Sequence, residues 1–239
     1  KNPFKDVRVR QALYQAIDSA GLHSRTMRNL SVPAGTMVAP MVHGWSKALD
    51  ERAAKYDVEA AKKLLADAGY PQGFALKLDC PNDRYVNDEA ICQAVTAMWT
   101  RIGVKTTLQA APMAQFVTRV MNNDVSAYLF GWGVATFDAL YSLEALMATK
   151  DGKTSAGNYN GGRFSDATLD GMIGQIKVEM GAAKRDALLA QALQRVKDGY
   201  YYIPLHHQIR PWAMRKNVET PHRADDRPMP TWTTIKSKR

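Results

Sequence analysis

Cysteine is scarce in this sequence, and long apolar runs are missing. Only Cys80 and Cys92 occur among 239 residues, and two thiols without a nearby histidine cluster are too few for a structural zinc site. No run of about 18 apolar residues is present, so the sequence predicts no membrane-spanning helix. The two cysteines leave two interpretations open: one disulfide, or two separate buried thiols.

The signatures of common enzyme families are also absent. The sequence has no GxSxG, P-loop, GxGxxG or HExxH motif, and each of these motifs carries a known chemistry. His206 and His207 are adjacent in an expected strand and so point to opposite faces, which disfavours joint metal binding. The acid pairs at residues 50–51 and 225–226 fall in polar turns, where solvated carboxylates are expected. We therefore expect no enzyme, no catalytic residue, no cofactor and no metal, with an unrecognised α/β enzyme as an alternative.

The net charge of +9, from 32 basic and 23 acidic residues, raises the question of a nucleic-acid partner. A basic nucleic-acid-binding module needs clustered Lys and Arg interleaved with exposed aromatic residues. The basic residues are scattered instead, and no block of five or more like charges occurs. We therefore expect no nucleic acid as a partner and keep this module only as an alternative.

What is present is an ordinary globular composition, 46% hydrophobic and 23% charged, with helical and strand periods that alternate along the chain. Apolar residues at helical spacing predict helices over residues 6–17, 57–68, 88–102, 112–121, 169–179 and 184–200. Alternation or short apolar runs predict strands over residues 74–80, 104–108, 126–130, 202–209 and 212–215. Because strands alternate with helices, the predicted fold class is α/β.

Six segments, in order, resemble the large solute-binding receptors of bacterial ABC importers, family 5, which includes dipeptide-, oligopeptide- and nickel-binding proteins. The most specific is YDVEAAKKLLADAGYPQGF at residues 56–74. The others are NPFKDVRVRQALYQAID at 2–18, IGVKTTL at 102–108, GW at 131–132, GNYNGGRFSDATLD at 157–170 and YYIPLHHQ at 201–208. The resemblance covers essentially the whole chain.

The resemblance implies one lobe of a periplasmic-binding-protein type II fold, a central mixed sheet flanked by helices. Residues 1–211 would be the carboxy-terminal ligand-binding lobe, the third domain of the family, and residues 212–239 would cross back to an amino-terminal lobe missing from this chain. The implied protein is periplasmic. It binds a peptide or similar small solute between its lobes and delivers it to ABC permease subunits in the inner membrane.

Ligands of open α/β sheets bind beyond the carboxyl ends of the strands, so three loops are candidates for the site. In the first loop, Arg84 and Tyr85 resemble the family's ligand-contacting Arg and Tyr, with the spacing off by one, and an Arg can bind a carboxylate through two hydrogen bonds. The alternative is a surface Arg paired with Asp83 or Asp88.

The second loop offers Trp132 as an apolar wall, or alternatively as a plug at the edge of the lobe. Dipeptide receptors carry an acid three positions after this Trp, where this sequence has Ala135. Asp138 matches a later acid of the family pattern and is the candidate substitute. A standard dipeptide ligand is therefore in doubt.

The third loop offers Asn158, Tyr159, Asn160 and Arg163. Asn and Tyr side chains can hydrogen-bond a peptide backbone whatever its side chains are, whereas the alternative is a solvated turn.

Overall fold

The structure, a computed structural model, describes residues 2–223 and 225–236, and the chain divides into two compact units. Unit 1 is Lys1–His207 and unit 2 is Gln208–Arg239. The expected boundary at residues 211 and 212 concerns a crossing to another lobe, and it stays a prediction.

The centre of unit 1 is a three-stranded sheet in the order β3-β2-β4. Strand β2 (Ala75–Pro81) pairs in parallel along its whole length with β3 (Lys105–Ala111). It also pairs in parallel with β4 (Ala127–Tyr128). Parallel neighbours need a crossover, and α4 (Asp88–Arg101) supplies it between β2 and β3. The predicted α/β fold class is confirmed.

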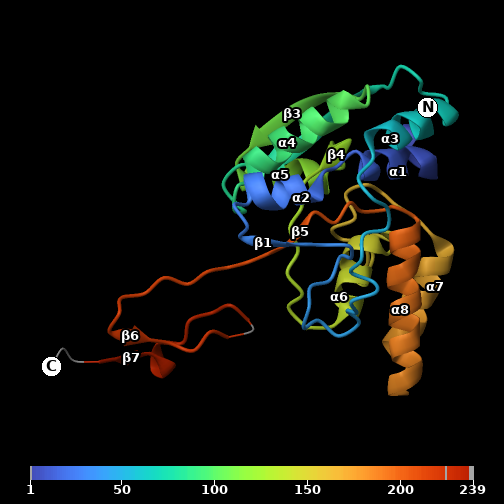
Figure 1. The fold of residues 1–239 in the computed structure, drawn as a ribbon. Coiled ribbons are helices and arrows are strands. Elements are labelled where there is room, and N and C mark those ends of the chain that lie inside the picture. The colour runs from blue at the N-terminus through green and yellow to red at the C-terminus, as the bar shows by residue number, and fades with distance from the viewer. Residues whose placement is uncertain (1, 224, 237–239) are drawn as a thin grey trace. The chain divides into compact units, whose positions relative to one another are not determined.

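One hydrophobic core packs α1 (Val7–Gln15), α3 (Val58–Asp67) and α4 against this sheet, as Figure 1 shows. Helix α3 begins where the Asp57 side chain accepts the Ala60 N–H at 2.8 Å, a standard N-cap. It ends before Gly69, whose φ of +89° suits a glycine at the residue after a helix. In the core, the Trp99 indole N–H donates to the Leu13 carbonyl at 3.0 Å, which joins α4 to α1.

A second core in unit 1 lies among α6 (Ala139–Ser142), α7 (Ala167–Val178) and α8 (Ala182–Asp198) (Figure 1). Its fully buried side chains include Leu143, Leu169 and Leu189. The segment from Met37 to Leu49 also packs here, so burial orders a stretch that contains none of the described helices or strands.

The remaining elements are short. In unit 1 they are the 3-10 helix η1 (Pro3–Lys5), α2 (Ser19–Gly21), the π-helix η2 (Leu22–Thr26), β1 (Ser31–Pro33), α5 (Met113–Met121) and the π-helix η3 (Leu143–Met147). Strand β5 (His206–Gln208), which pairs with β1, lies where unit 1 ends.

Unit 2 contains an antiparallel pair, β6 (Val218–Glu219) with β7 (Thr234–Ile235), and the 3-10 helix η4 (Pro230–Trp232). The strand expected over residues 212–215 is wrong, because none of the described strands includes this segment. The Trp212 indole N–H instead donates to Asp226 at 2.7 Å, and Arg210 pairs with the same carboxylate at 2.6 Å. Side-chain contacts within unit 2, not a sheet ladder, hold this segment.

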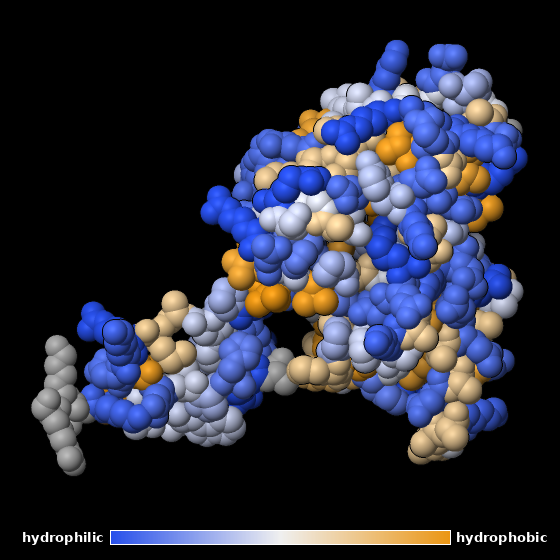
Figure 2. Space-filling model, viewed as in Figure 1, coloured by the Kyte–Doolittle hydropathy of each residue, from blue (hydrophilic) through white to orange (hydrophobic). Residues whose placement is uncertain are grey.

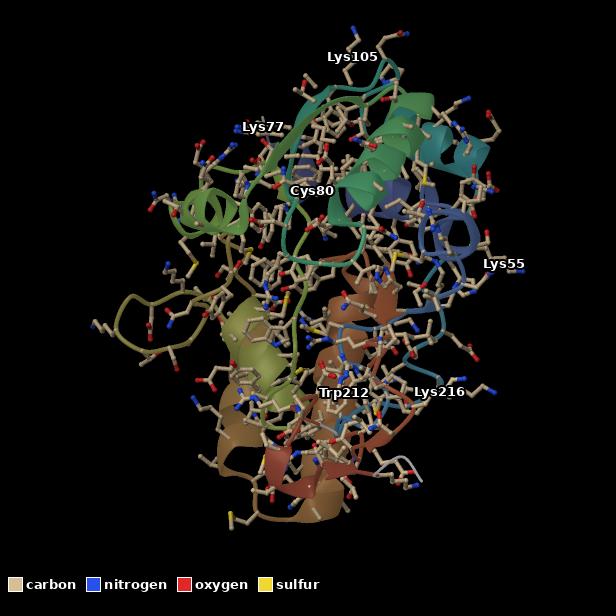
Figure 3. The ribbon with its side chains drawn as sticks, turned by 90° about the vertical axis from the view of Figure 1, so that its left-hand side faces the viewer. Lys55, Lys77, Cys80, Lys105, Trp212 and Lys216 are labelled. Atoms are coloured by element: carbon tan, nitrogen blue, oxygen red, sulfur yellow. A yellow bond between two sulfur atoms is a disulfide. The ribbon has the colours of Figure 1, made fainter. Side chains whose placement is uncertain are left out.

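Polar residues dominate the face seen in Figure 2, and apolar residues form separate patches there. Lys55, Lys77 and Lys105 lie at separate places on unit 1 (Figure 3), in agreement with the scattered charge of the sequence. Of the helices described, none is both long and apolar enough to span a bilayer.

We expect the isolated chain to fold cooperatively, because it contains its own βαβ unit and two hydrophobic cores. Thermal melting followed by circular dichroism checks this. A largely disordered spectrum at low temperature would contradict a self-sufficient lobe.

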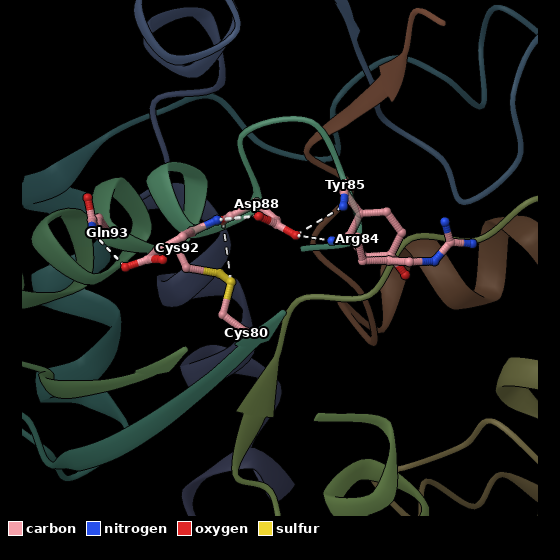
Figure 4. Close-up of a disulfide and its surroundings, with 7 residues drawn as sticks. Cys80, Arg84, Tyr85, Asp88, Cys92 and Gln93 are labelled. Carbon is pink, nitrogen blue, oxygen red and sulfur yellow. Dashed lines mark hydrogen bonds between the residues drawn. A yellow bond between two sulfur atoms is a disulfide. The ribbon is translucent and has the colours of Figure 1, made fainter. Parts of the chain in front are cut away.

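A disulfide joins Cys80 near the end of β2 to Cys92 on α4 (Figure 4). The bond closes a loop with a sequence separation of 12. We expect the double variant Cys80→Ser, Cys92→Ser to lower the free energy of unfolding by about 3 kcal/mol, the chain-entropy value for a loop of this size. Urea unfolding of the oxidised wild type and the variant measures the difference. Intact-mass analysis after alkylation without reductant is the control, and two alkylated thiols in wild type purified under oxidising conditions would contradict the bond.

Candidate functional site

The loop after β2 is held by the buried carboxylate of Asp88, at the start of α4. Its Oδ2 accepts the backbone N–H groups of Arg84 and Tyr85, each at 3.0 Å (Figure 4), and its Oδ1 accepts the Glu89 N–H at 2.9 Å. Burial makes these bonds obligatory, because an unsatisfied buried carboxylate is costly. The Asp88 carboxylate therefore serves the loop backbone and is not an ion-pair partner of the Arg84 side chain.

The side chains of Arg84 and Tyr85 extend this loop toward the segment after β4. Arg84 is exposed, and its guanidinium lies 5.5 Å from the centre of the Tyr85 ring. The Tyr85 hydroxyl donates to the Gly131 carbonyl at 3.1 Å. Because β2 and β4 are parallel, the loops that follow them meet at the same edge of the sheet.

Trp132 lies at the centre of a group of aromatic side chains at this edge. It stacks on Tyr141 of α6, with ring centres 5.2 Å apart, and meets Tyr159 of the third loop edge-on at 5.0 Å. We call the aromatic cluster the six residues linked by such ring contacts, Phe116, Tyr128, Phe130, Trp132, Tyr141 and Tyr159. The structure thus brings Tyr85, Trp132 and Tyr159 from three expected loops to one place.

The third loop divides into structural and exposed residues. Asn160 is buried: its amide donates to the carbonyls of Ala148 and Phe164, and its Oδ1 accepts the Phe164 N–H. It therefore holds the loop and is not available to a ligand, contrary to the role considered from the sequence. Asn158 and Arg163 are exposed.

Asp138 is committed to contacts within the protein. Its carboxylate accepts two hydrogen bonds from the Arg185 guanidinium, at 2.7 and 3.0 Å, and caps α6 by accepting the Leu140 N–H at 2.9 Å. Burial by itself raises the pKa of Asp138, but hydrogen bonds from Arg185, Leu140 and His43 outweigh it and lower the pKa to about 2. No described cation other than Arg185 and His43 pairs with it.

His43 lies between two carboxylates, with Nδ1 3.1 Å from Asp138 and Nε2 2.7 Å from Asp186. The hydrogen bond to Asp138, followed in size by the one to Asp186, raises the pKa of His43 above its ordinary value of 6.5. Neither His43 nor Arg185 could be assigned from the sequence, because Asp138 lies 95 and 47 residues away from them.

Two carboxylates that the sequence predicted to be solvated instead form hydrogen bonds and ion pairs within the protein. Asp50 accepts the Gly35 N–H at 2.8 Å, the Trp45 indole N–H at 2.9 Å and contacts His207 at 3.0 Å. Burial alone raises its pKa, but these hydrogen bonds outweigh burial and lower it. In unit 2, Asp226 bonds Arg210 and Trp212. The prediction of solvated carboxylates was wrong for Asp50 and Asp226, because folding brings them partners that lie outside their own turns.

Two cavities of the described residues, of about 10 and 390 Å³, are lined by other residues than Arg84, Trp132 and Tyr159. Within residues 2–223 and 225–236, no group of three or more His, Cys, Asp or Glu side chains could hold a metal ion. The residues brought together are thus the aromatic cluster and, beside it, Tyr85 with the exposed Arg84.

Four members of the aromatic cluster, Phe116, Tyr128, Phe130 and Tyr141, were missed by sequence reasoning, although a signal existed for two of them. Tyr128 and Phe130 precede Trp132 at intervals of two, the spacing that places side chains on one face of a strand.

Comparison with known proteins identifies relatives for most of the chain. The sequence model of the bacterial extracellular solute-binding proteins, family 5 Middle, matches residues 1–154. Heme-binding protein A of Haemophilus influenzae is 29% identical over 217 residues, covering 87% of this chain and 38% of that protein. The probable deoxycholate-binding periplasmic protein of Escherichia coli is 28% identical, with the same coverage of both proteins.

The fold also matches solved structures. A dipeptide-binding protein from Pseudoalteromonas, solved with Met-Leu, superposes with a TM-score of 0.85 at 19% identity, covering 99% of this chain and 46% of that one. The chain thus spans about two fifths of the length of the curated relatives it matches.

The raised pKa of His43 predicts a pH-dependent contribution to stability. Because folding raises the pKa of His43, its protonated ring stabilises the folded state. This stabilisation is complete at pH values below the unfolded pKa of 6.5 and is lost as the pH rises through the folded pKa. We therefore expect His43→Gln to lower the free energy of unfolding more at pH 5 than at pH 9, measured by urea unfolding. His23→Gln is the matched control, because that ring contacts Ser31 rather than a carboxylate. An equal loss at both pH values would contradict the assignment.

Proposed function

Because this chain belongs to the bacterial extracellular solute-binding proteins of family 5, we propose that it is the ligand-binding lobe of an ABC importer's periplasmic receptor. In this proposal the receptor closes over a peptide or similar small solute and delivers it to permease subunits in the inner membrane. The complete receptor, as we use the term below, is this chain together with an amino-terminal lobe. Residues 212–239 would cross back to that lobe.

The observation that carries the proposal is the meeting of three loops at the carboxyl edge of the parallel sheet. Tyr85, Trp132 and Tyr159 come together there from segments far apart in the sequence. Ligands of open α/β sheets bind at this edge, and aromatic side chains are the usual lining of small-molecule sites. The exposed Arg84 adds a charged hydrogen-bond donor beside the aromatic surface.

The relatives support binding rather than catalysis. Their names describe heme-binding, deoxycholate-binding and dipeptide-binding proteins. The range of named solutes supports a receptor function for this chain without selecting one solute. The candidate residues Arg84, Trp132 and Tyr159 line neither of the two cavities described above, which fits a site that a second lobe completes.

We expect Arg84→Ala and Trp132→Ala each to weaken solute binding by the complete receptor. Losing a charge-assisted hydrogen bond in a closed cleft costs about 1.5 to 3 kcal/mol, whereas an exposed Arg contributes almost nothing. Calorimetric titration with the solute that co-purifies with the receptor measures both variants. Arg101→Ala, at the exposed end of α4, is the matched control.

We also expect the isolated chain to bind this solute weakly or not at all. With only one wall of the cleft present, hydrogen bonds to Arg84 stay exposed to water and are weakened by its high dielectric constant. Tight binding by the isolated chain would contradict the two-lobe mechanism, and unchanged affinity in both variants would contradict the site.

A further inference from the structure

We infer that the solute is an anion with a flat apolar body, and that the receptor needs no ammonium group on it. This inference rests on the proposed function, because it assigns the chemical class of solute to the same site. It follows from which charged groups at the site remain available and which are already used within the protein.

The apolar part of the inference comes from the aromatic cluster. Trp132 is partly exposed and is braced by near-parallel stacking on Tyr141, at 25°, and by the edge-on ring of Tyr159. Phe130 also stacks on Trp132, at 27°. Rings held from several sides form a rigid surface, and such a surface favours a flat, apolar body over a flexible polar chain.

The two least exposed carboxylates of the candidate loops are engaged within the protein. Asp138 is held by the Arg185 guanidinium and by the N-terminus of α6. Asp88 is buried and accepts three backbone N–H groups, whereas Asp83 is exposed and accepts the Met113 N–H at 2.7 Å through one oxygen only. An ammonium group would have to displace a partner of Asp138 or Asp88, so neither of these two carboxylates is a ready anchor for a cation.

The arginines are in the opposite situation. Arg84 and Arg163 are exposed, and neither guanidinium forms an ion pair with any carboxylate in the described parts of the chain. Arg84 lies against the Tyr85 ring, whose hydroxyl is bonded to Gly131 next to Trp132. A planar guanidinium beside an aromatic surface matches a solute that joins a carboxylate to an apolar body.

The Trp132 indole N–H is a further donor near this surface. It is buried and has no acceptor among the described residues. A buried donor without an acceptor is unfavourable, so a small shift of the ring that brings it to a solute oxygen, charged or neutral, would be favoured.

A matched set of probes tests the charge requirement on the complete receptor. N-acetyl-Phe-Phe carries one negative charge, its amide N-acetyl-Phe-Phe-NH₂ is neutral, and Phe-Phe-NH₂ carries only the ammonium. Deoxycholate supplies a carboxylate on a non-peptide body and separates a peptide source of the anion from a steroid source. Calorimetric titration or quenching of tryptophan fluorescence gives each affinity.

We expect at least one of the two anionic probes to bind, and to bind about 10-fold or more tighter than Phe-Phe-NH₂, the gain of a charge-assisted hydrogen bond. The variant Arg84→Gln should lower affinity for that anionic probe by a similar factor. If N-acetyl-Phe-Phe is the probe that binds, Arg84→Gln should also abolish its advantage over the neutral amide. Arg101→Gln should leave every affinity unchanged.

The remaining outcomes distinguish a wrong solute class from a wrong receptor function. Tighter binding of Phe-Phe-NH₂ than of both anions, or anion binding that Arg84→Gln does not change, would overturn the inference and leave the receptor function standing. Binding of none of the four probes would overturn the inference, while the co-purified solute would still test the receptor function independently.

Discussion

The parallel pairing of β2 with both β3 and β4 is the constraint on which the site depends. Parallel strands end at the same edge of a sheet, so the loops that follow β2 and β4 must meet there, whatever their own sequences prefer. The α4 crossover and the Cys80–Cys92 disulfide fix the end of β2 against a helix. The hydrogen bond from Tyr85 to Gly131 is a consequence of this geometry rather than its cause.

Buried and partly buried carboxylates hold the irregular loops in place. Asp50, Asp88 and Asp138 each accept backbone N–H groups, and Asp50 and Asp138 also contact side chains; each organises a loop that lacks a sheet ladder. Carboxylates used in this way are unavailable for ligands. The same contacts that order the loops therefore also influence the charge that a solute meets, because Asp88 and Asp138 are used internally while the exposed Arg84 forms no ion pair with the described residues.

The regular elements were largely predictable from periodicity. The helices expected over residues 57–68 and 88–102 correspond to α3 and α4, since their apolar faces, N-terminal Asp residues and terminal glycines all favour the same structure. Short strands were less predictable. The strand expected over residues 126–130 shrinks to Ala127–Tyr128, and the one expected over residues 212–215 is absent from the described strands. A strand exists only where a partner lies beside it, and a local pattern does not supply the partner.

The sequence by itself determined the α/β class, the family and the candidate loops, because periodicity and short motifs are local properties of the chain. Only the tertiary structure decided which candidates share a surface and which are used internally. Trp132 and Tyr159 meet across 27 residues, and Asp138 is occupied by Arg185 across 47 residues. Whether a charged side chain is free for a ligand depends on partners that folding brings from a distance, and no local pattern encodes those partners.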